Sequence, residues 1–390
     1  MFYLQSPVGN RTVIHAAQKG RAGFDSLRQW KASWFASGTA ALSAAVKTAV
    51  VVRGLEHPEV LLPAYGCPDL VAAIRHAGAK PYFVDLSPDS FRMNSLTVAD
   101  AIKKRPSVVA LIGIDLFGCP ENWSELYELC RGNDIVAIRD CAQSLQSREK
   151  IDRELDADYL VYSFGRGKPL YLQGGGALLR RADALSELTR AQVEVEAPLE
   201  IRDKWYSRAK NELYNALLEP HLYAVVARLL GKRIGITRYE PLEKIERAPL
   251  EFAELANPAL EGFWRNHRSR QNELMAMLSA IKSQLAGLVK VAPNYPGPKQ
   301  TLLRLPLLLR DRSMRDELQA AMLNSGIGAT TMYGEPLPFI NGVGSEQGKR
   351  SFPMAEDIAG RLLTLPLHER INDRDLTAMK NCLLNMRTRY

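Results

Sequence analysis

Residues Tyr162-Ser163-Phe164-Gly165-Arg166-Gly167-Lys168-Pro169 join the end of an apolar run to a glycine-rich turn that carries one lysine. Such a lysine suits a Schiff base with a carbonyl cofactor, provided that a sheltered site keeps its amine neutral part of the time. Taken alone, the turn is more typical of an ordinary loop or of an anion site. It is not a Walker A loop, because the GxxxxGK[ST] spacing is absent and Pro169 follows the lysine.

Apolar runs alternate with helical stretches on both sides of this turn, from about Trp34 to about Arg181. Short continuous apolar strands separated by helices are typical of an α/β fold, with a mainly parallel sheet covered on both faces. In such sheets, ligands bind where loops leave the carboxyl ends of the strands. The pattern predicts strands at 59–63, 81–86, 107–114, 135–139 and 159–164, and helices at 40–52, 69–77, 98–104 and 123–130.

The chain changes character after residue 185 and stays polar, basic and helical in its periodicity to about residue 275. Within this part, residues 213–230 form an amphipathic stretch that Pro220 should kink or split. We expect the stretch to pack on a core or on a partner subunit. An interfacial membrane helix is the alternative.

The α/β pattern returns near residue 302. It predicts a strand at 302–309 and helices at 314–324 and 373–385. We therefore expect two domains. The large one covers residues 1–255, with a divergent helical segment at 185–255, and a smaller C-terminal α+β domain covers residues 256–390.

Composition narrows the class of protein. The net charge of +8 could attract nucleic acid, an acidic membrane surface or an anionic small molecule. Zinc-finger spacing, an aromatic RNA-binding signature and a long basic block are all absent, so we expect no nucleic acid. Attraction for an anionic substrate explains the excess charge, and so does surface solubility alone. No run of about twenty uncharged apolar residues predicts a transmembrane segment. The N-terminus does not resemble a signal peptide, and the five cysteines are scattered, so we expect a cytoplasmic protein without a structural metal.

Three further features flank the lysine turn. Ser37-Gly38-Thr39 precedes an Ala-rich helix and could cradle a phosphate with free N–H groups at the helix start, or could be an ordinary cap. Asp140 follows the predicted strand at 135–139, where a carboxylate could pair with a protonated pyridine nitrogen or simply cap a turn. The glycine cluster Gln173-Gly174-Gly175-Gly176 suggests a close approach of two backbones.

The order of these features resembles the DegT/StrS-type sugar aminotransferase family, whose members are fold-type-I enzymes with pyridoxal 5'-phosphate (PLP). SGT begins a helix, DxAQ follows about a hundred residues later, SFxxxK about twenty after that, and a glycine cluster comes last. The segments ASGTAAL and VLLPAYGCPDLVAAIRHAGAKPYFVDLSPDSF resemble the N-terminal half of the family, and GIGATTMYGEPLP and FPMAEDIAGRLLTLPLHERI its C-terminal domain. Only residues from about 185 to 300 do not align.

The resemblance implies a role for each matching residue. Lys168 would carry the cofactor as a Schiff base and move the proton between the substrate Cα and the cofactor. Asp140 would pair with the pyridine nitrogen. Tyr65 matches a ring-stacking position, although a half-buried tyrosine after a strand is the alternative. The remaining cofactor contacts would come from Gln143 at the phenolic oxygen side and from Gly38, Thr39 and Ser163 at the phosphate.

This chain departs from the family at several positions. Asp115-Leu116-Phe117-Gly118 stands where the family usually has His-Leu-Tyr-Gly, and Arg139 stands where Glu usually precedes the aspartate. Gly174 takes a frequent Glu position. The family's Asn-Tyr-Arg-Met stretch, whose Asn reaches the partner subunit's phosphate, has its nearest match in Gly235-Ile236-Thr237-Arg238-Tyr239. These changes keep the cofactor chemistry and leave the substrate open.

Two other side chains could serve the substrate. Arg166 could grip a carboxylate or a diphosphate, or could be a solvated loop residue. His368, in LPLHER, is expected to pack or cap rather than to catalyse.

The resemblance implies a PLP-dependent aminotransferase that moves an amino group from an amino acid, glutamate being the expected donor, to a keto group on a nucleotide-linked sugar. It also implies a homodimer, and the retained Lys168 argues against the family's dehydratase branch, which has histidine there. Two alternatives stay open: other PLP chemistry, such as a lyase, a decarboxylase or a transferase for a non-sugar ketone, and a non-catalytic binding or regulatory protein of the same fold.

Overall fold

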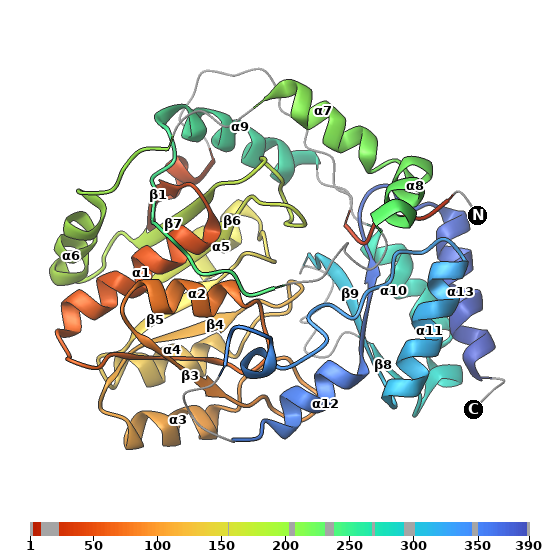
Figure 1. Cartoon of the computed structure of the whole chain (residues 1–390), viewed down its shortest axis with the longest axis horizontal. Coiled ribbons are helices and arrows are strands. Elements are labelled where there is room, and N and C mark those ends of the chain that lie inside the picture. Colours follow the sequence, from red (N-terminus) through yellow and green to blue (C-terminus); the bar gives the residue numbers. More distant parts are fainter. Residues whose placement is uncertain are drawn as a thin grey trace.

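The computed structural model describes residues 3–8, 23–154, 156–202, 207–230, 238–266, 270–291, 301–344 and 350–387. A large unit built on a seven-stranded sheet lies beside a smaller unit built on a three-stranded sheet (Figure 1). Among the described residues, no helix is long and apolar enough to cross a membrane.

The large sheet has the strand order β1-β7-β6-β5-β4-β2-β3. The pairs from β6 through β3 are parallel, whereas β7 is antiparallel to both of its neighbours, so the sheet is mixed and mainly parallel as predicted. Every residue of the interior strand β4 is buried, as expected for a sheet covered on both faces. The strands are β1 (Trp30–Phe35), β2 (Glu59–Pro63), β3 (Lys80–Val84), β4 (Val108–Ile114), β5 (Val136–Asp140), β6 (Tyr159–Ser163) and β7 (Gly176–Arg181).

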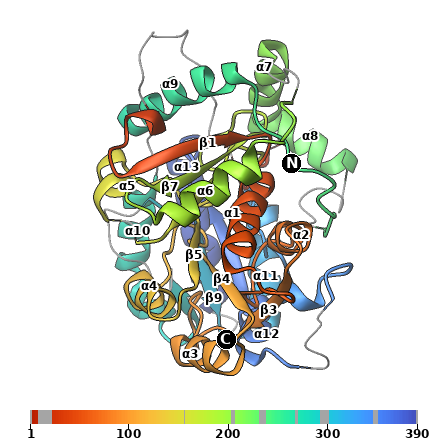
Figure 2. The same cartoon turned by 90° about the vertical axis from the view of Figure 1, so that its left-hand side faces the viewer.

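Helices cover both faces of this sheet (Figure 2). On one face α1 packs against α2 and α6, and its alanines allow a close approach to the strands. The other face carries α3 and α4, next to a cluster that includes Phe24, Trp30 and Phe252. The bounds are α1 (Gly38–Arg53), α2 (Asp69–His76), α3 (Ser95–Lys104), α4 (Trp123–Arg131), α5 (Arg148–Glu154), α6 (Ser186–Glu196) and the 3-10 helix η1 (Gly23–Ser26).

The divergent middle segment is helical, and Pro220 splits its amphipathic stretch as predicted. Helix α7 (Arg208–Leu217) ends before the proline, and α8 (Pro220–Leu230) begins at it, because proline tolerates the first helical position. The next helix, α9 (Leu250–Asn266), crosses the predicted boundary between residues 255 and 256 and packs on η1 of the large unit. The division into domains stays a prediction.

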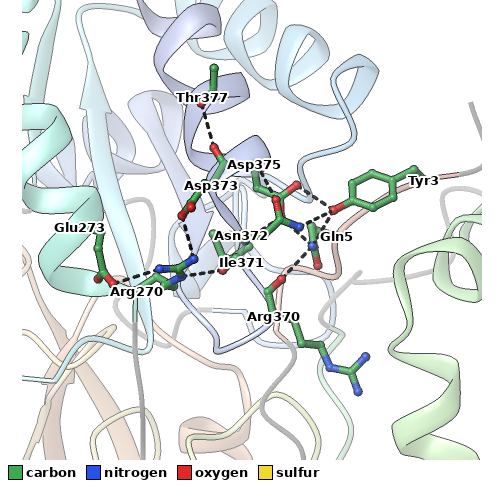
Figure 3. A network of polar contacts seen from close by, with 10 residues as sticks. All are labelled: Tyr3, Gln5, Arg270, Glu273, Arg370, Ile371, Asn372, Asp373, Asp375 and Thr377. Atoms are coloured by element: carbon green, nitrogen blue, oxygen red, sulfur yellow. Dashed lines mark hydrogen bonds and ion pairs between the residues drawn. The ribbon is translucent and has the colours of Figure 1, made fainter.

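The small unit pairs its strands in the order β10-β9-β8, all antiparallel. The N-terminal segment is bound to this unit, where Tyr3 Oη and Gln5 Nε2 each donate a hydrogen bond of 2.8 Å to Asp375 (Figure 3). The elements of the small unit are α10 (Gln271–Ala280), η3 (Lys282–Leu285), β8 (Val289–Val291), β9 (Arg304–Leu309), α11 (Arg312–Asn324), η4 (Leu337–Phe339), α12 (Pro353–Arg361), β10 (Leu362–Pro366) and α13 (Asp373–Arg387).

Candidate active site

The start of α1 meets the end of β6. Ser37 caps the helix, with its hydroxyl accepting a 3.0 Å hydrogen bond from the Ala40 N–H. Gly38 lies so close to Ser163 that a Cβ added to Gly38 would sit 2.6 Å from the Cβ of Ser163. Thr39 follows and is partly exposed. A helix start with unpaired N–H groups and adjacent hydroxyls has the chemistry of a phosphate site.

The glycine cluster packs against this turn. Gly175 forms a parallel bridge with Ser37, and a Cβ on Gly176 would lie 2.4 Å from the Ser37 carbonyl oxygen. Gly175 has φ +89°, and a side chain there would also collide with Phe252. Glycine is therefore required on steric grounds, as the close approach predicted from the sequence implies.

Asp140 ends β5 and is buried. Its Oδ1 accepts a 2.8 Å hydrogen bond from the Ala142 N–H. Burial raises the pKa of Asp140 to about 6, while the positive charge of Lys168 acts in the opposite direction. The carboxylate is consequently mainly ionised at neutral pH and lies within electrostatic reach of the lysine. Lys168 also interacts with the thiol of Cys67, whose pKa is raised to about 12 by burial.

Two departures from the family pattern meet in one buried ion pair behind Asp140. Arg139 donates from Nε and Nη2 to Oδ2 of Asp115, at 3.0 and 2.8 Å, and its guanidinium lies 5.1 Å from the ring centroid of Trp123. Trp123 Nε1 donates to the other carboxylate oxygen at 3.0 Å. The Asp115 N–H donates to the backbone carbonyl of Asp140 at 3.0 Å. The pair thus helps to fix the backbone that carries the candidate ring-pairing carboxylate.

Gln143 connects the two units. Its Oε1 accepts a 3.1 Å hydrogen bond from the Phe117 N–H, and its Nε2 donates to the Tyr333 hydroxyl at 2.8 Å. The ring of Tyr333 meets Tyr65 edge to face at 5.5 Å between centroids. Tyr65 is buried rather than half-buried, and burial raises the pKa of both phenols. Since Tyr333 comes from the small unit, the candidate cofactor site includes residues from both units.

Sequence reasoning missed Cys67 and Tyr333. Both lie inside segments quoted for the resemblance, and neither was singled out. The Tyr333 contact spans 190 positions along the chain, so no local pattern could have predicted it. Cys67 follows β2, and its position after an apolar strand is the one signal that could have marked it.

Lys168 lines a cavity between the units. Its lining comprises Val8, Gly167, Lys168, Tyr171, Tyr214, Leu303 and His368.

The other two candidate substrate residues have contrasting environments. Arg166 is exposed and interacts electrostatically with Tyr171 and Tyr214 of the cavity wall. His368 is buried, and its Nε2 lies 2.9 Å from the Ser6 carbonyl oxygen, so this nitrogen carries the proton. Burial lowers the pKa of His368 to about 4, which keeps the ring neutral.

Of the remaining departures, Gly174 lies in the cluster described above. In the nearest match to the Asn-Tyr-Arg-Met stretch, residues 235–237 lie outside the described residues. Tyr239 ends this match, and the guanidinium of Arg75 lies 5.5 Å from the centroid of the Tyr239 ring.

Comparison with known families gives a match over residues 27–201 and 258–383 to the DegT/DnrJ/EryC1/StrS aminotransferase family. The chain belongs to this family. Within its span the match leaves out only residues 202–257, so the expectation that residues from about 185 to 300 do not align was too wide: residues 185–201 and 258–300 are matched. This enzyme is accordingly a PLP-dependent aminotransferase of fold type I.

Several relatives span most of the chain. A pleiotropic regulatory protein of Geobacillus stearothermophilus is 25% identical over 86% of this chain and 80% of its own length. The UDP-N-acetyl-3-dehydro-alpha-D-glucosamine 3-aminotransferase of Acidithiobacillus ferrooxidans is 25% identical over 87% of this chain and 80% of its own. Among solved structures, NtdA of Bacillus subtilis with bound cofactor PMP has a TM-score of 0.64 at 15% identity, covering 93% of this chain and 74% of its own.

Proposed function

We propose that this enzyme moves an amino group from an amino acid, glutamate in the first instance, to a keto group on a nucleotide-linked sugar, with Lys168 as the residue that holds PLP. The observation that carries the proposal is the electrostatic interaction between Asp140, at the carboxyl end of β5, and Lys168, in the turn after the neighbouring strand β6. A lysine amine and a buried ionised carboxylate are the two groups that this cofactor chemistry needs.

The residues of the site fit the cofactor. PLP, when bound, supplies an electron sink for the substrate Cα. Asp140 would hold a proton on the pyridine nitrogen, and Lys168 would take and return the proton at the substrate Cα. The phosphate would rest at the start of α1, where Gly38 permits the approach of Ser163. The remaining contacts are proposed for Thr39 at the phosphate, Gln143 at the phenolic oxygen side and Tyr65 at the ring.

The acceptor class rests on charge and on relatives. The name of the Acidithiobacillus relative denotes an enzyme that acts on a UDP-linked sugar. The present chain carries a net charge of +8, and Arg166 is exposed next to the cavity of Lys168. A nucleotide diphosphate would be attracted by such a surface.

A homodimer is part of the proposal. Helices α7 and α8 expose a series of large apolar side chains, as expected for a face that a second copy covers. These are Leu213, Leu217, Leu222, Val225 and Leu229, which are 38 to 79% exposed. Light scattering of the purified protein should give twice the mass of one chain, and a monomer at micromolar concentration would argue against the dimer.

The principal experiment uses the visible absorption of lysine-bound PLP. Lys168→Ala should lose this band and reduce amine transfer from glutamate by at least about 10³-fold, because the proton carrier at the substrate Cα is removed. Lys104→Ala is the matched control, since Lys104 is exposed and pairs with Asp100 on the surface.

The outcomes separate the candidate activities. Bleaching of the band by glutamate in the wild-type protein, with release of 2-oxoglutarate, supports amine transfer. Product formed from an amino acid without any keto acceptor would instead indicate a lyase. A bound cofactor that no amino acid changes would indicate a non-catalytic role. If Lys168→Ala keeps the band, the lysine assignment is wrong.

A further inference from the structure

Two residues in the wall of the Lys168 cavity come from outside the part of the chain that matches the family. The match begins at residue 27 and leaves out residues 202–257. Val8, in the N-terminal segment, and Tyr214, in α7, nevertheless line the cavity together with Lys168. On a shared fold, the features that adapt a site to its own ligand are those grafted onto the common scaffold. Val8 and Tyr214 are therefore placed where recognition of this enzyme's own substrate is expected.

Helix α7 is fastened to the loop that follows Lys168. The side-chain amide of Gln173 donates to the Ser207 carbonyl at 2.8 Å, and its oxygen accepts from the Ser207 N–H at 3.3 Å. Ser207 is the residue that caps α7. Further along the helix, Tyr214 lies against Tyr171, with 4.1 Å between the ring centroids and 36° between the ring planes. These contacts hold the Tyr214 ring in the cavity wall.

A second set of contacts holds Val8 in the same wall. The Ser6 carbonyl accepts a 2.9 Å hydrogen bond from His368, which also lines the cavity. A Cβ added to Gly328 would collide with the backbone of the N-terminal segment, so the segment passes where glycine leaves room for it. Val8 then lies beside the lysine turn, since a Cβ added to Gly167 would be 3.7 Å from the Val8 Cγ2. The N-terminal segment is thus built into the site.

The cavity wall is mostly apolar and aromatic. Val8 and Leu303 add aliphatic surface to the two tyrosine rings. Burial raises the pKa of both phenols, that of Tyr214 to about 12, so the rings are uncharged at neutral pH. Such a wall suits an uncharged ring with apolar faces and a rim of hydroxyls, because the C–H groups pack on the side chains and the phenol hydroxyls serve the rim. A hexose has this shape.

We propose that Tyr214, together with Tyr171 and Val8, determines which sugar the enzyme accepts, by packing on the hexose ring that carries the keto group. The inference rests on the proposed function, in which the keto carbon must reach Lys168. The sugar ring then occupies the cavity of Lys168. The exposed Arg166, which interacts electrostatically with both tyrosines, is available to the diphosphate. Helix α7 thereby adapts a common cofactor site to one acceptor.

The test compares the binding of a nucleotide sugar with that of its nucleotide alone. UDP-N-acetylglucosamine and UDP, and GDP-mannose and GDP, are titrated into the PLP-loaded protein by calorimetry. The ratio of the two dissociation constants in a pair isolates the contribution of the sugar, and the wild type should bind at least one nucleotide sugar more tightly than its nucleotide. Tyr214→Ala should reduce that ratio roughly 10-fold, the effect of losing about 50 Å² of apolar contact, while the affinity for the nucleotide stays unchanged.

Two further variants separate a contact with the sugar from a structural role. Tyr214→Phe keeps the aromatic ring and should keep most of the ratio. Tyr127→Ala is the matched control, because Tyr127 is also partly buried on a helix, α4, and lies outside the cavity wall described above. Its ratio should equal that of the wild type. The rate at which glutamate bleaches the PLP band should be the same in all of these proteins, because the donor reacts before the sugar enters.

Three results would overturn the assignment. The first is a wild-type ratio in Tyr214→Ala. The second is an equal loss of affinity for the nucleotide and for the nucleotide sugar, which would make Tyr214 a nucleotide contact or a structural residue. The third is a wild-type protein that binds neither nucleotide sugar more tightly than its nucleotide. Because binding does not require turnover, a ratio that depends on Tyr214 in a protein whose PLP band glutamate leaves unchanged would count against the proposed function alone.

Discussion

Two buried arginines have opposite environments. Arg139, in strand β5 of the large unit, donates two hydrogen bonds to Asp115. Burial by itself lowers the pKa of Arg139, but the carboxylate more than compensates and the pKa is raised. Arg304, on the small unit, has one hydroxyl partner, and its pKa falls to about 10. The fold pairs the first charge with a carboxylate, whereas no carboxylate among the described residues pairs with the second.

The difference separates a buried cation that has its own carboxylate from one that has none. A buried guanidinium with its own carboxylate stiffens the backbone around it, here the segment that ends in Asp140. A buried guanidinium without one lowers the stability of the protein, because its desolvation is not offset by an opposite charge. The two cases predict opposite responses to removal of the charge.

The largest effect is expected for Arg139→Met. It leaves the carboxylate of Asp115 buried without its cation, and it should lower the free energy of unfolding by about 3–5 kcal/mol. Chemical denaturation of the cofactor-free protein measures this change.

The double variant Asp115→Leu with Arg139→Met provides the control. Removing both charges together should recover most of the lost stability, because no uncompensated charge remains. If the double variant is as unstable as Arg139→Met, the pair does not carry the effect.

An intermediate effect is expected for Asp140→Asn, and it depends on pH. The pKa of about 6 in the folded protein lies above the value of about 3.9 for a free aspartate. Stability from this group is present below about pH 4 and is lost as the pH rises through 6. At pH 7.5 the cofactor-free variant should therefore be more stable than the wild type by up to about 3 kcal/mol, and the two should be equal near pH 4.

The same substitution should weaken retention of PLP, because the neutral amide cannot stabilise a protonated pyridine. Denaturation curves at pH 4 and 7.5, together with cofactor titration, measure both effects. A variant that is less stable at pH 7.5 would contradict the buried, ionised state of Asp140.

The smallest effect on stability is expected for Arg304→Met, within about 1 kcal/mol of the wild type and in the direction of a more stable free protein. Methionine fills much of the same space without a charge. A destabilisation as large as that of Arg139→Met would mean that Arg304 has an internal partner and is structural. That result would remove the distinction between the two arginines.

The sequence predicted the strands from β2 to β6 to within two residues, because each is a continuous apolar run that only a doubly covered sheet accommodates. It also marked Asp140 and Lys168 as residues after strands, where loops collect at one edge of the sheet. Strand β1 and its pairing with β7 were not predicted. Its buried and exposed positions do not alternate cleanly, so no regular period marked it.

The sequence by itself determined the fold class, the family and the residues that follow the strands, because these depend on local patterns and on motif order. Only the tertiary structure decided which charges are paired. Asp115 and Arg139 were two separate departures from the family pattern until strand pairing brought them within 2.8 Å. Arg304 carried no local signal at all. The energy of a buried charge depends on what surrounds it in space, and that is fixed only when distant segments pack together.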